Sequence, residues 1–209
     1  VMEDANIDVA VDGLMDGAMF NSGQCCCGIE RIYVHQSVYN EFLEKSIVRV
    51  NSHRLGNPLD PDITLGPMAS PRLAKLVRKQ IFTAIEEGAT PHIERFAKDD
   101  GESYLSPQIL TNVNHGMDIM REENFGPVVG VMPVNDDIEA IRMMNDSNYG
   151  LTASLWTGNL KRAEQIGKRV ETGTVFMNRA DYLDPALCWT GCKDTGRSGA
   201  LSTIGYQNL

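Results

Sequence analysis

The sequence predicts an α/β fold in three layers, in which a largely parallel sheet is flanked by helices. Two observations predict this class. Short β-rich segments alternate with helical segments along most of the chain, and several of the helical segments are ten or more residues long. Parallel strands need crossover connections of this length, and the crossover helices cover both faces of the sheet. The 209 residues, 42% of them hydrophobic, suffice for one compact domain.

The elements follow from the spacing of apolar residues and from the residues that punctuate them. Apolar residues recur at three- and four-residue steps in five stretches, at residues 7–18, 39–50, 73–85, 136–145 and 159–170. Five β-rich segments are expected to be strands, at residues 31–35, 108–110, 128–134, 152–156 and 174–178. Asp4, Ser37 and Ser70 are the expected N-caps of the first three helices, and Gly23 and Gly88 should end the first and third.

Two further stretches show neither the helical spacing of apolar residues nor a β-rich composition. Residues 56–67 are rich in Gly and Pro and predict an extended loop. Residues 94–106 are polar and predict a mobile surface excursion.

Charge and hydropathy restrict the partners. The net charge is −9 and there is no basic cluster, so we expect neither nucleic acid nor an anionic membrane as a partner, since both need dense Lys and Arg. No apolar run approaches the roughly 20 residues of a membrane span. The first residues lack a basic segment followed by an apolar one, which is the pattern of a secretory signal. The expected location is the cytoplasm.

Three of the five cysteines are consecutive, at residues 25–27. Disulfides between neighbouring residues are strained, so reduced thiols are expected. A zinc site is not expected either, because consecutive residues converge poorly on one tetrahedral ion and Cys188 with Cys192 has no matching second pair. We therefore predict no metal.

The same three thiols lie behind a Gly23-Gln24 turn, at the junction between a helix and a strand. Backbone N–H groups at such a junction can stabilise a thiolate, and a stabilised thiolate is a nucleophile. Free cysteine more often packs as a small apolar residue, however. The pattern alone leaves both interpretations open.

The order of several motifs identifies a family. The chain contains Gly23-Gln24-Cys25-Cys26, then Glu122-Glu123-Asn124-Phe125-Gly126-Pro127, and then Glu171-Thr172-Gly173-Thr174 followed by a strand. In this order the motifs resemble the C-terminal half of aldehyde dehydrogenases, over nearly the whole chain. The resemblance implies that residues 1–209 form a single domain of the aldehyde dehydrogenase catalytic type, and that the N-terminal NAD-binding domain is absent from this chain.

The resemblance also implies the chemistry of one thiol. Cys26 matches the family's nucleophile, whereas Cys25 and Cys27 match positions at which other residues occur. The family oxidises an aldehyde to a carboxylic acid: the sulfur holds the aldehyde carbon as a thiohemiacetal, loss of hydride gives a thioester, and water hydrolyses the thioester. The backbone N–H of Cys26 should face the developing oxyanion.

Two residues of the second motif match positions that contact the cofactor, which is NAD or NADP in the full-length family. Glu123 should accept hydrogen bonds from the nicotinamide ribose, and the ring of Phe125 should lie against the nicotinamide. Without the resemblance, Glu123 would be taken as a solvated acid and Phe125 as a core aromatic. Asn178 should serve the structure, and residues 178–184 should belong to the substrate-access loop.

Several parts of the family's machinery are missing from the 209 residues. The Gly-rich nucleotide-binding region, the general-base glutamate and the oxyanion-hole asparagine all precede the nucleophile in relatives. We therefore expect no tight cofactor binding and no hydride transfer by this chain alone. Residues 186–199 also depart from the usual pattern, which leaves the subfamily open.

Three functions compete on these grounds. The first is the catalytic half of an NAD(P)-dependent aldehyde dehydrogenase that acts on a small-molecule aldehyde. The second is a stand-alone cysteine esterase, with Glu123, His35 and His53 as candidate bases. The third is a non-catalytic interaction domain. In any of these roles, the surface that would face a nucleotide-binding half favours that partner or a homo-oligomer.

Overall fold

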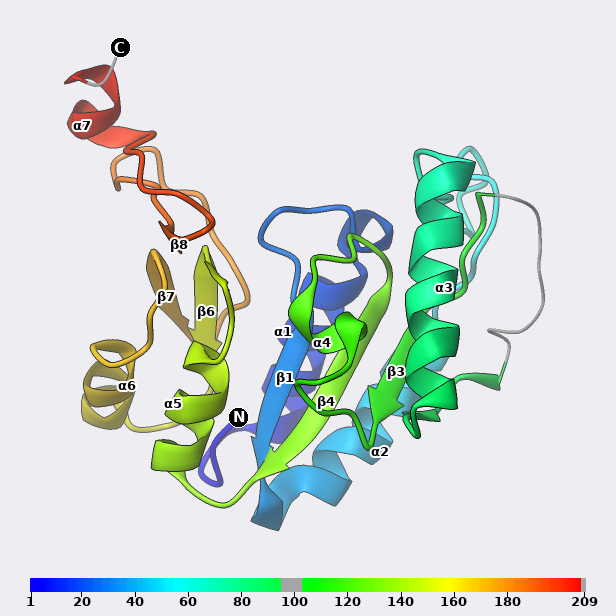
Figure 1. Cartoon of the computed structure of the whole chain (residues 1–209), viewed down its shortest axis with the longest axis horizontal. Helices are drawn as coiled ribbons and strands as arrows, with labels where there is room; N and C mark the ends of the chain where they lie inside the picture. Colours follow the sequence, from blue (N-terminus) through cyan, green and yellow to red (C-terminus); the bar gives the residue numbers. More distant parts are fainter. Residues whose placement is uncertain (95–102, 208–209) are drawn as a thin grey trace.

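The computed structural model describes residues 1–94 and 103–207, and its centre is a four-stranded sheet (Figure 1). The strand order is β1-β4-β3-β2. The bounds are Arg31–His35 for β1, Val128–Val134 for β4, Gln108–Thr111 for β3 and Thr90–Pro91 for β2. The first three of these strands run parallel, and β2 is antiparallel to β3.

Helices cover both faces of this sheet. On one face α1 (Ile7–Met19) and α2 (Tyr39–Asn51) enclose a core that includes Phe42, Val34 and Ile109. On the other face α3 (Pro71–Glu86) and α4 (Asp118–Arg121) pack against Leu110 and Val128. The side chains of neighbouring β3 residues thus lie in opposite cores, because successive side chains of a strand point to opposite faces of the sheet. The three-layer α/β prediction is confirmed.

A smaller lobe lies beside the main sheet. Its parallel pair is β6 (Thr152–Leu155) with β7 (Thr174–Met177), beside α5 (Asp137–Asn145) and α6 (Leu160–Gly167). A short antiparallel pair, β5 (Tyr149–Gly150) with β8 (Cys192–Lys193), and α7 (Ser202–Gln207) complete it. Figure 1 shows the segment after β7 extending away from the body of the molecule.

Charged contacts tie the start of the chain to this lobe. The Arg162 guanidinium donates to Asp137 at 2.7 Å and to Glu3 at 2.9 Å. The Thr157 hydroxyl donates to both carboxylate oxygens of Asp4, at 2.7 and 2.8 Å. The first four residues are therefore fixed to α5, α6 and the end of β6.

The predicted caps were only partly right. Asn6, not Asp4, caps α1, because its side chain accepts from the Val9 amide while Asp4 is engaged by Thr157. A 3₁₀ turn, Gln36–Val38, precedes α2, and His35 rather than Ser37 caps that turn. Ser70 precedes α3 as expected, although its side chain makes no capping bond.

The predicted helix ends and loops also had mixed outcomes. The first helix ends at Met19, and Phe20–Gly23 is a 3₁₀ turn, so Gly23 ends the turn rather than the helix. Gly88 follows the end of α3 with φ of +108°, as expected of a helix stop. Most of the excursion predicted for residues 94–106 lies outside the described residues.

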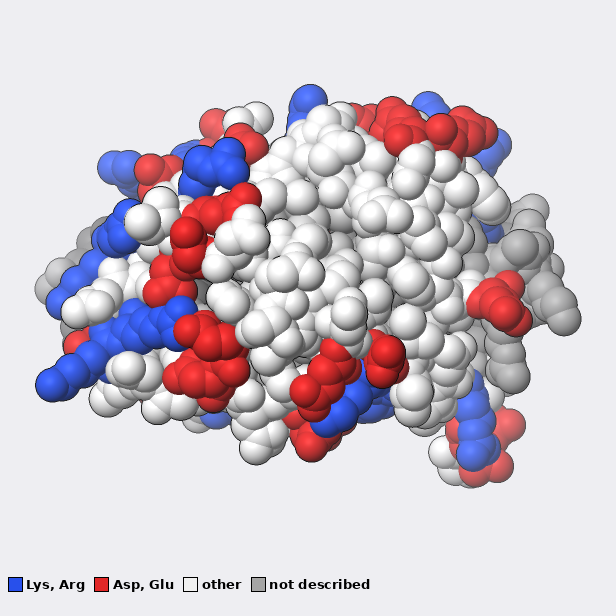
Figure 2. Space-filling view, turned by 90° about the horizontal axis from the view of Figure 1, so that it is seen from below, with Lys and Arg blue, Asp and Glu red and all other residues white. Residues whose placement is uncertain are grey.

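Among the residues that the structure describes, none of the helices has the length and hydropathy to cross a bilayer. One face of the molecule carries no charged side chain over its central area, and acidic and basic side chains mingle around the rim (Figure 2).

Candidate active site

The thiols lie on a tight turn between α1 and β1, and backbone conformation forms this turn. Asn21, Ser22 and Gly23 all have left-handed φ angles, of 50°, 57° and 74°. A Cβ atom added to Gly23 would lie 2.0 Å from the carbonyl oxygen of Gly126. Only glycine combines this φ with so close an approach. Gly23 therefore lets the turn touch residues 126–127, and so brings two motifs together that are about a hundred residues apart in the sequence.

Side chains of the turn hold it against a second loop. The Ser22 hydroxyl donates to the Gly66 carbonyl at 2.6 Å. Gln24 donates to the Asn21 carbonyl at 2.9 Å and accepts from the Ala69 amide at 2.8 Å. The glutamine of the Gly-Gln-x-Cys motif thus stabilises the turn that carries the thiols.

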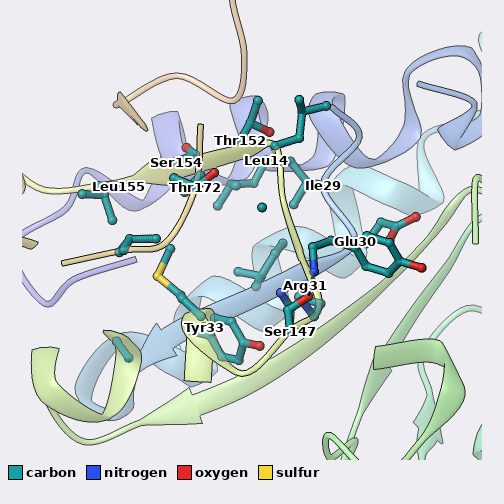
Figure 3. Close-up of a pocket in the computed structure, with 18 of the residues that line it drawn as sticks. Leu14, Ile29, Glu30, Arg31, Tyr33, Ser147, Thr152, Ser154, Leu155 and Thr172 are labelled. Carbon is teal, nitrogen blue, oxygen red and sulfur yellow. Dashed lines mark hydrogen bonds between the residues drawn. The ribbon is translucent and has the colours of Figure 1, made fainter. Parts of the chain in front are cut away.

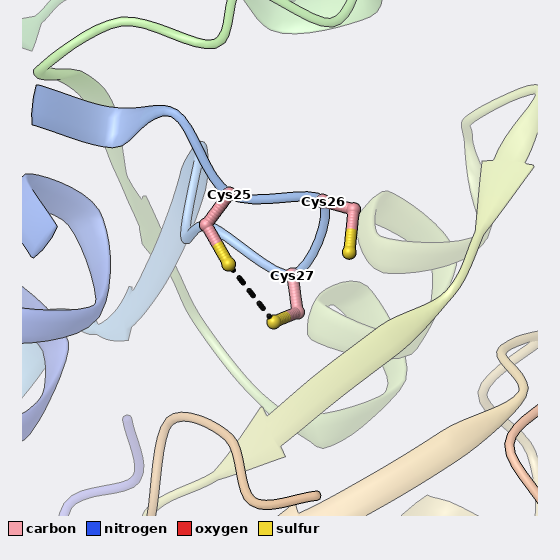
Figure 4. Close-up of side chains that lie close together, drawn as sticks. All are labelled: Cys25, Cys26 and Cys27. Atoms are coloured by element: carbon pink, nitrogen blue, oxygen red, sulfur yellow. Dashed lines mark hydrogen bonds between the residues drawn. The ribbon is translucent and has the colours of Figure 1, made fainter. Parts of the chain in front are cut away.

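The three thiols have different surroundings (Figure 4). Cys27 is buried, and its sulfur lies 3.3 Å from the Cys25 sulfur and 2.9 Å from Oδ2 of Asp181. Burial raises the pKa of the Cys27 thiol strongly, and the hydrogen bonds to Asp181 and Cys25 raise it further. Cys27 therefore stays a protonated thiol that donates to Asp181, which makes it a poor nucleophile.

Cys26 is the exposed member of the three. In Figure 4 its sulfur lies on the same side of the turn as the other two, outside the dashed Cys25–Cys27 contact. Among the described residues, no acceptor takes the backbone N–H of Cys26. An exposed thiol beside a backbone N–H that has no acceptor is the arrangement that acyl chemistry needs. Burial in apolar surroundings, which would have excluded Cys26 as a nucleophile, is not found.

The three sulfur atoms lie within 4.8 Å of one another. They therefore converge more closely than we expected for three consecutive residues. Both the turn at residues 25–27 and the burial of Cys27 produce this convergence. The raised pKa of Cys27 opposes the loss of a proton that metal ligation requires. The absence of a metal remains a prediction.

A cavity of about 200 Å³ runs between β1 and β6, and its lining includes Cys26, Glu123 and Phe125. The side chain of Glu123 is exposed and that of Phe125 is half-buried. The fold thus brings the predicted nucleophile and both predicted cofactor contacts to one cavity, although they come from two separate loops. Figure 3 shows the cavity between the two strands, with Glu30 and Tyr33 on the β1 side and Ser154 on the β6 side.

Glu30, directly before β1, is a residue of the site that sequence reasoning missed. Its Oε1 accepts from the backbone N–H groups of Asn124 at 2.9 Å and Phe125 at 3.3 Å. Phe125 has a left-handed φ of 49°, so this loop needs an external anchor. Burial raises the pKa of Glu30, and the two backbone hydrogen bonds act in the opposite direction. Glu30 therefore holds the loop that carries Glu123 and Phe125.

The C-terminal loop contributes Asp181, whose bond to Cys27 joins residues 154 positions apart. Nearby, the Arg179 guanidinium lies 4.1 Å from the ring centre of Tyr182. Asn178 exchanges two hydrogen bonds with the backbone of Thr157, at 3.0 and 2.9 Å. The structural interpretation of Asn178 is supported by these bonds.

Comparison with known proteins identifies the family to which the sequence is similar. The sequence profile of the aldehyde dehydrogenase family matches residues 1–208. The mitochondrial aldehyde dehydrogenase family 2 member B4 of Arabidopsis thaliana is 36% identical over 208 residues, which are 100% of this chain and 39% of that protein. Lactaldehyde dehydrogenase of Escherichia coli (strain K12) is 34% identical over 201 residues, which are 96% of this chain and 42% of that protein.

Solved structures agree in fold. Betaine aldehyde dehydrogenase of Staphylococcus aureus, in complex with NAD+, superposes with a TM-score of 0.93 at 31% identity, over 99% of this chain and 42% of that one. The structure of Gox0499 gives a TM-score of 0.94 at 36% identity, over 99% of this chain and 45% of that one. The chain spans about two fifths of the length of the curated relatives that it matches. With the profile matched along all but its last residue, this chain belongs to the aldehyde dehydrogenase family.

Proposed function

We propose that this chain is the catalytic half of an NAD(P)-dependent aldehyde dehydrogenase, with Cys26 as its nucleophile. The observation that carries the proposal is the exposure of Cys26 at a cavity that Glu123 and Phe125 also line. The thiols of Cys25 and Cys27 form a hydrogen bond with each other instead, and Cys27 is buried. Of the three adjacent thiols, Cys26 is thus the most exposed, although the half-buried Cys25 also lines the cavity.

In the proposed reaction the Cys26 thiolate attacks the aldehyde carbon. A carbon–sulfur bond forms, the carbonyl π electrons move onto oxygen, and the Cys26 N–H donates a hydrogen bond to that oxygen. Loss of hydride from the same carbon leaves a thioester on Cys26. Water then adds to the thioester and expels the sulfur, which releases the carboxylic acid.

The nicotinamide cofactor supplies the hydride acceptor when it is bound. This chain offers it two groups. The exposed Glu123 carboxylate is an acceptor for a ribose diol, and the half-buried ring of Phe125 offers a flat apolar surface. Glu30 keeps both on one loop by bonding its backbone. Two such contacts cover only a fraction of a dinucleotide, so we expect no tight binding without a nucleotide-binding half.

The proposal is tested on the 209-residue chain with an activated aryl acetate. We expect one acetyl group on the peptide that contains residues 25–27, found by mass spectrometry after a short reaction at neutral pH. Cys26→Ser should abolish this acylation, whereas Cys25→Ser is the matched control and should retain it. Acylation that persists in Cys26→Ser, or that is lost only in Cys25→Ser, contradicts the assignment of the nucleophile.

Hydride transfer is tested separately. We expect no NADH to form when the chain is mixed with NAD+ and an aldehyde, because the nucleotide is held by too few groups. Measurable turnover under these conditions would contradict the proposal that the isolated chain is incomplete.

A thiol esterase is the second candidate, and the exposure of Cys26 favours it as well, since ester cleavage requires no nicotinamide. Of the three candidate bases, Glu123 and His35 line the cavity, whereas His53 is not among its lining residues. The aryl acetate experiment separates the candidates: repeated turnover supports an esterase, and acylation that stops after one equivalent supports a catalytic half without its base.

We also propose that the chain associates with a partner, either a second copy or a nucleotide-binding half. The segment that follows β7 extends from the body (Figure 1) and leaves large apolar side chains in water. These exposed side chains are Tyr182, Leu183, Leu187, Leu201, Ile204 and Tyr206. Apolar surface of this kind favours an interface. Sedimentation velocity should therefore show a dimer or larger species, and a stable monomer at all concentrations would argue against self-association.

A further inference from the structure

Two of the three neighbouring thiols, Cys25 and Cys26, line the cavity, so position alone does not decide which of them reacts. Residues 25–28 form one turn, in which the Gly28 N–H donates to the Cys25 carbonyl at 3.0 Å. Cys26 and Cys27 are the corner residues of this turn. The sulfurs of Cys25 and Cys27 meet across it at 3.3 Å (Figure 4). The hydrogen bonds of the thiols therefore have to distinguish Cys25 from Cys26.

The number of hydrogens fixes the direction of these bonds. The Cys27 thiol has a single hydrogen, which it donates to Oδ2 of Asp181 at 2.9 Å. Its contact with Cys25 must then be made by the Cys25 hydrogen, with the Cys27 sulfur as the acceptor. The three groups thus form one hydrogen-bond chain, from the Cys25 thiol to the Cys27 thiol and on to the Asp181 carboxylate.

A thiol that donates at the head of this chain is a weak nucleophile. The thiolate is the reactive form of cysteine, and Cys25 becomes a thiolate only by giving up the proton that it donates to Cys27. The new negative charge would then lie only one sulfur away from the Asp181 carboxylate. The Cys26 sulfur lies outside the dashed contact in Figure 4 and has neither restraint.

The loop after β7 holds Asp181 at the thiols through contacts with two other elements. The Ser154 hydroxyl of β6 donates to the Arg179 carbonyl at 2.7 Å, and Nε of Arg179 donates to the Asp181 carbonyl at 2.9 Å. Between these two residues Ala180 is buried against α1, where a Cβ atom added to Gly17 would lie 2.7 Å from the Ala180 Cβ. The backbone of Asp181 is therefore fixed to β6 and to α1, and its carboxylate is a defined end of the hydrogen-bond chain.

We propose that Cys27 and Asp181 are positioning residues for the nucleophile: their hydrogen-bond chain keeps Cys25 as a thiol, so that Cys26 alone takes up the acyl group. The inference rests on the proposed function of Cys26. Without the chain, a Cys25 thiolate would attack the thioester carbon on Cys26. A carbon–sulfur bond to Cys25 would form, the bond to Cys26 would break, and the Cys26 sulfur would leave as a thiolate. The chain thus keeps the acyl group on the exposed sulfur, where water can add.

The test measures alkylation of each thiol in the 209-residue chain by iodoacetamide, after a short reaction at neutral pH, with the label located by fragment-ion mass spectrometry. Cys27→Ala breaks the hydrogen-bond chain in its middle, and Asp181→Ala breaks it at its end, which frees the Cys27 hydrogen to donate to Cys25. Cys27→Ser keeps the chain, because a hydroxyl accepts from Cys25 and donates to Asp181. Asp184→Ala is the matched control, since it removes a bond within the same loop, to the Ala186 N–H at 2.9 Å.

The quantity compared is the ratio of labelling at Cys25 to labelling at Cys26. We expect this ratio to rise about tenfold in Cys27→Ala and in Asp181→Ala, which is the effect of losing one hydrogen bond. It should keep the wild-type value in Cys27→Ser and in Asp184→Ala. The excess should also shrink at higher pH, because Cys25 of the wild type then loses its proton as well. A mere packing defect would change the ratio equally at every pH.

Three results would overturn the proposal: a wild-type ratio in Asp181→Ala, a rise in Cys27→Ser as large as in Cys27→Ala, or a rise that does not depend on pH. If Cys27→Ala does not fold, Asp181→Ala against its control decides the question alone. Alkylation involves no acyl group, so this test can fail while Cys26 is still the residue that an aryl acetate acylates. Acylation that persists in Cys26→Ser would instead contradict the proposed function.

Discussion

Replacing Glu30 should loosen the loop that carries Glu123 and Phe125, and the size of the effect follows from two hydrogen bonds. In Glu30→Ala the backbone N–H groups of Asn124 and Phe125 lose their acceptor. A buried donor left without a partner costs about 1–3 kcal/mol. The bond to Phe125, at 3.3 Å, contributes less than the bond to Asn124, at 2.9 Å. We expect the free energy of unfolding to fall by about 2–4 kcal/mol.

Glu30→Gln separates the hydrogen bonds from the charge. The amide oxygen of glutamine can accept from the same two N–H groups, so this variant should lie within about 1 kcal/mol of the wild type. Its relative stability should also depend on pH. The pKa of Glu30 is raised in the folded protein above the value of 4.5 in the unfolded chain. A raised pKa of an acid contributes stability that is complete below pH 4.5 and is lost as the pH rises through the folded value. Glu30→Gln should therefore gain on the wild type as the pH rises above 4.5.

The assay is urea unfolding followed by the fluorescence of Trp156 and Trp189, repeated at several pH values. Glu44→Ala is the matched control, because Glu44 is exposed on α2 and should change the unfolding free energy by less than about 0.5 kcal/mol. Hydrogen exchange at the amides of Asn124 and Phe125 should accelerate in Glu30→Ala but not in the control. The reasoning is refuted if Glu30→Gln is as unstable as Glu30→Ala, or if its difference from the wild type is the same at every pH.

Three further changes test other parts of the structure. Phe42→Ala removes a fully buried ring and should cost about 3–5 kcal/mol in urea unfolding; a cost below 1 kcal/mol would contradict the core described here. Asp181→Asn removes a carboxylate that raises the pKa of Cys27, so a thiol titration above pH 8 should show Cys27 reacting at lower pH, and an unchanged curve would contradict that contact. Gly23→Ala should destabilise the chain by more than Gly88→Ala in the same unfolding assay, because both have positive φ but only Gly23 has a neighbouring carbonyl oxygen where the Cβ must go; equal losses would contradict this close approach.

Much of the fold could be predicted because its signals are local. The strand Val128–Val134 has the bounds expected from its unbroken apolar run, and α3 begins at Pro71 after Ser70, as the sequence suggests. The capping of α1 could not be predicted in the same way. Asp4 and Asn6 are both good N-caps, and the choice depends on Thr157, which reaches Asp4 from 153 residues away.

In the candidate site, too, local motifs could be predicted and contacts between distant residues could not. A sequence motif pointed to Cys26, Glu123 and Phe125, and the fold brings all three to one cavity. Their roles there remain predictions. Glu30 gave no signal, because a glutamate beside a strand is ordinarily a surface residue and its partners lie 94 and 95 positions away. The contact between Cys27 and Asp181 was hidden for the same reason, although the sequence had marked the loop of Asp181 as part of the substrate-access region.

Arg162 ties the start of the chain to the smaller lobe chiefly by charge, since its partly solvated guanidinium bonds Asp137 of α5 and Glu3, which precedes α1. Mobile ions weaken such attractions: the Debye length falls from about 10 Å at 0.1 M salt to about 3 Å at 1 M. The apolar cores on the two faces of the main sheet have no comparable sensitivity. Concentrated electrolyte should therefore weaken the hold of Arg162 on Glu3, whereas Trp156, which follows β6 and is buried in the core beside α1, should keep the smaller lobe attached.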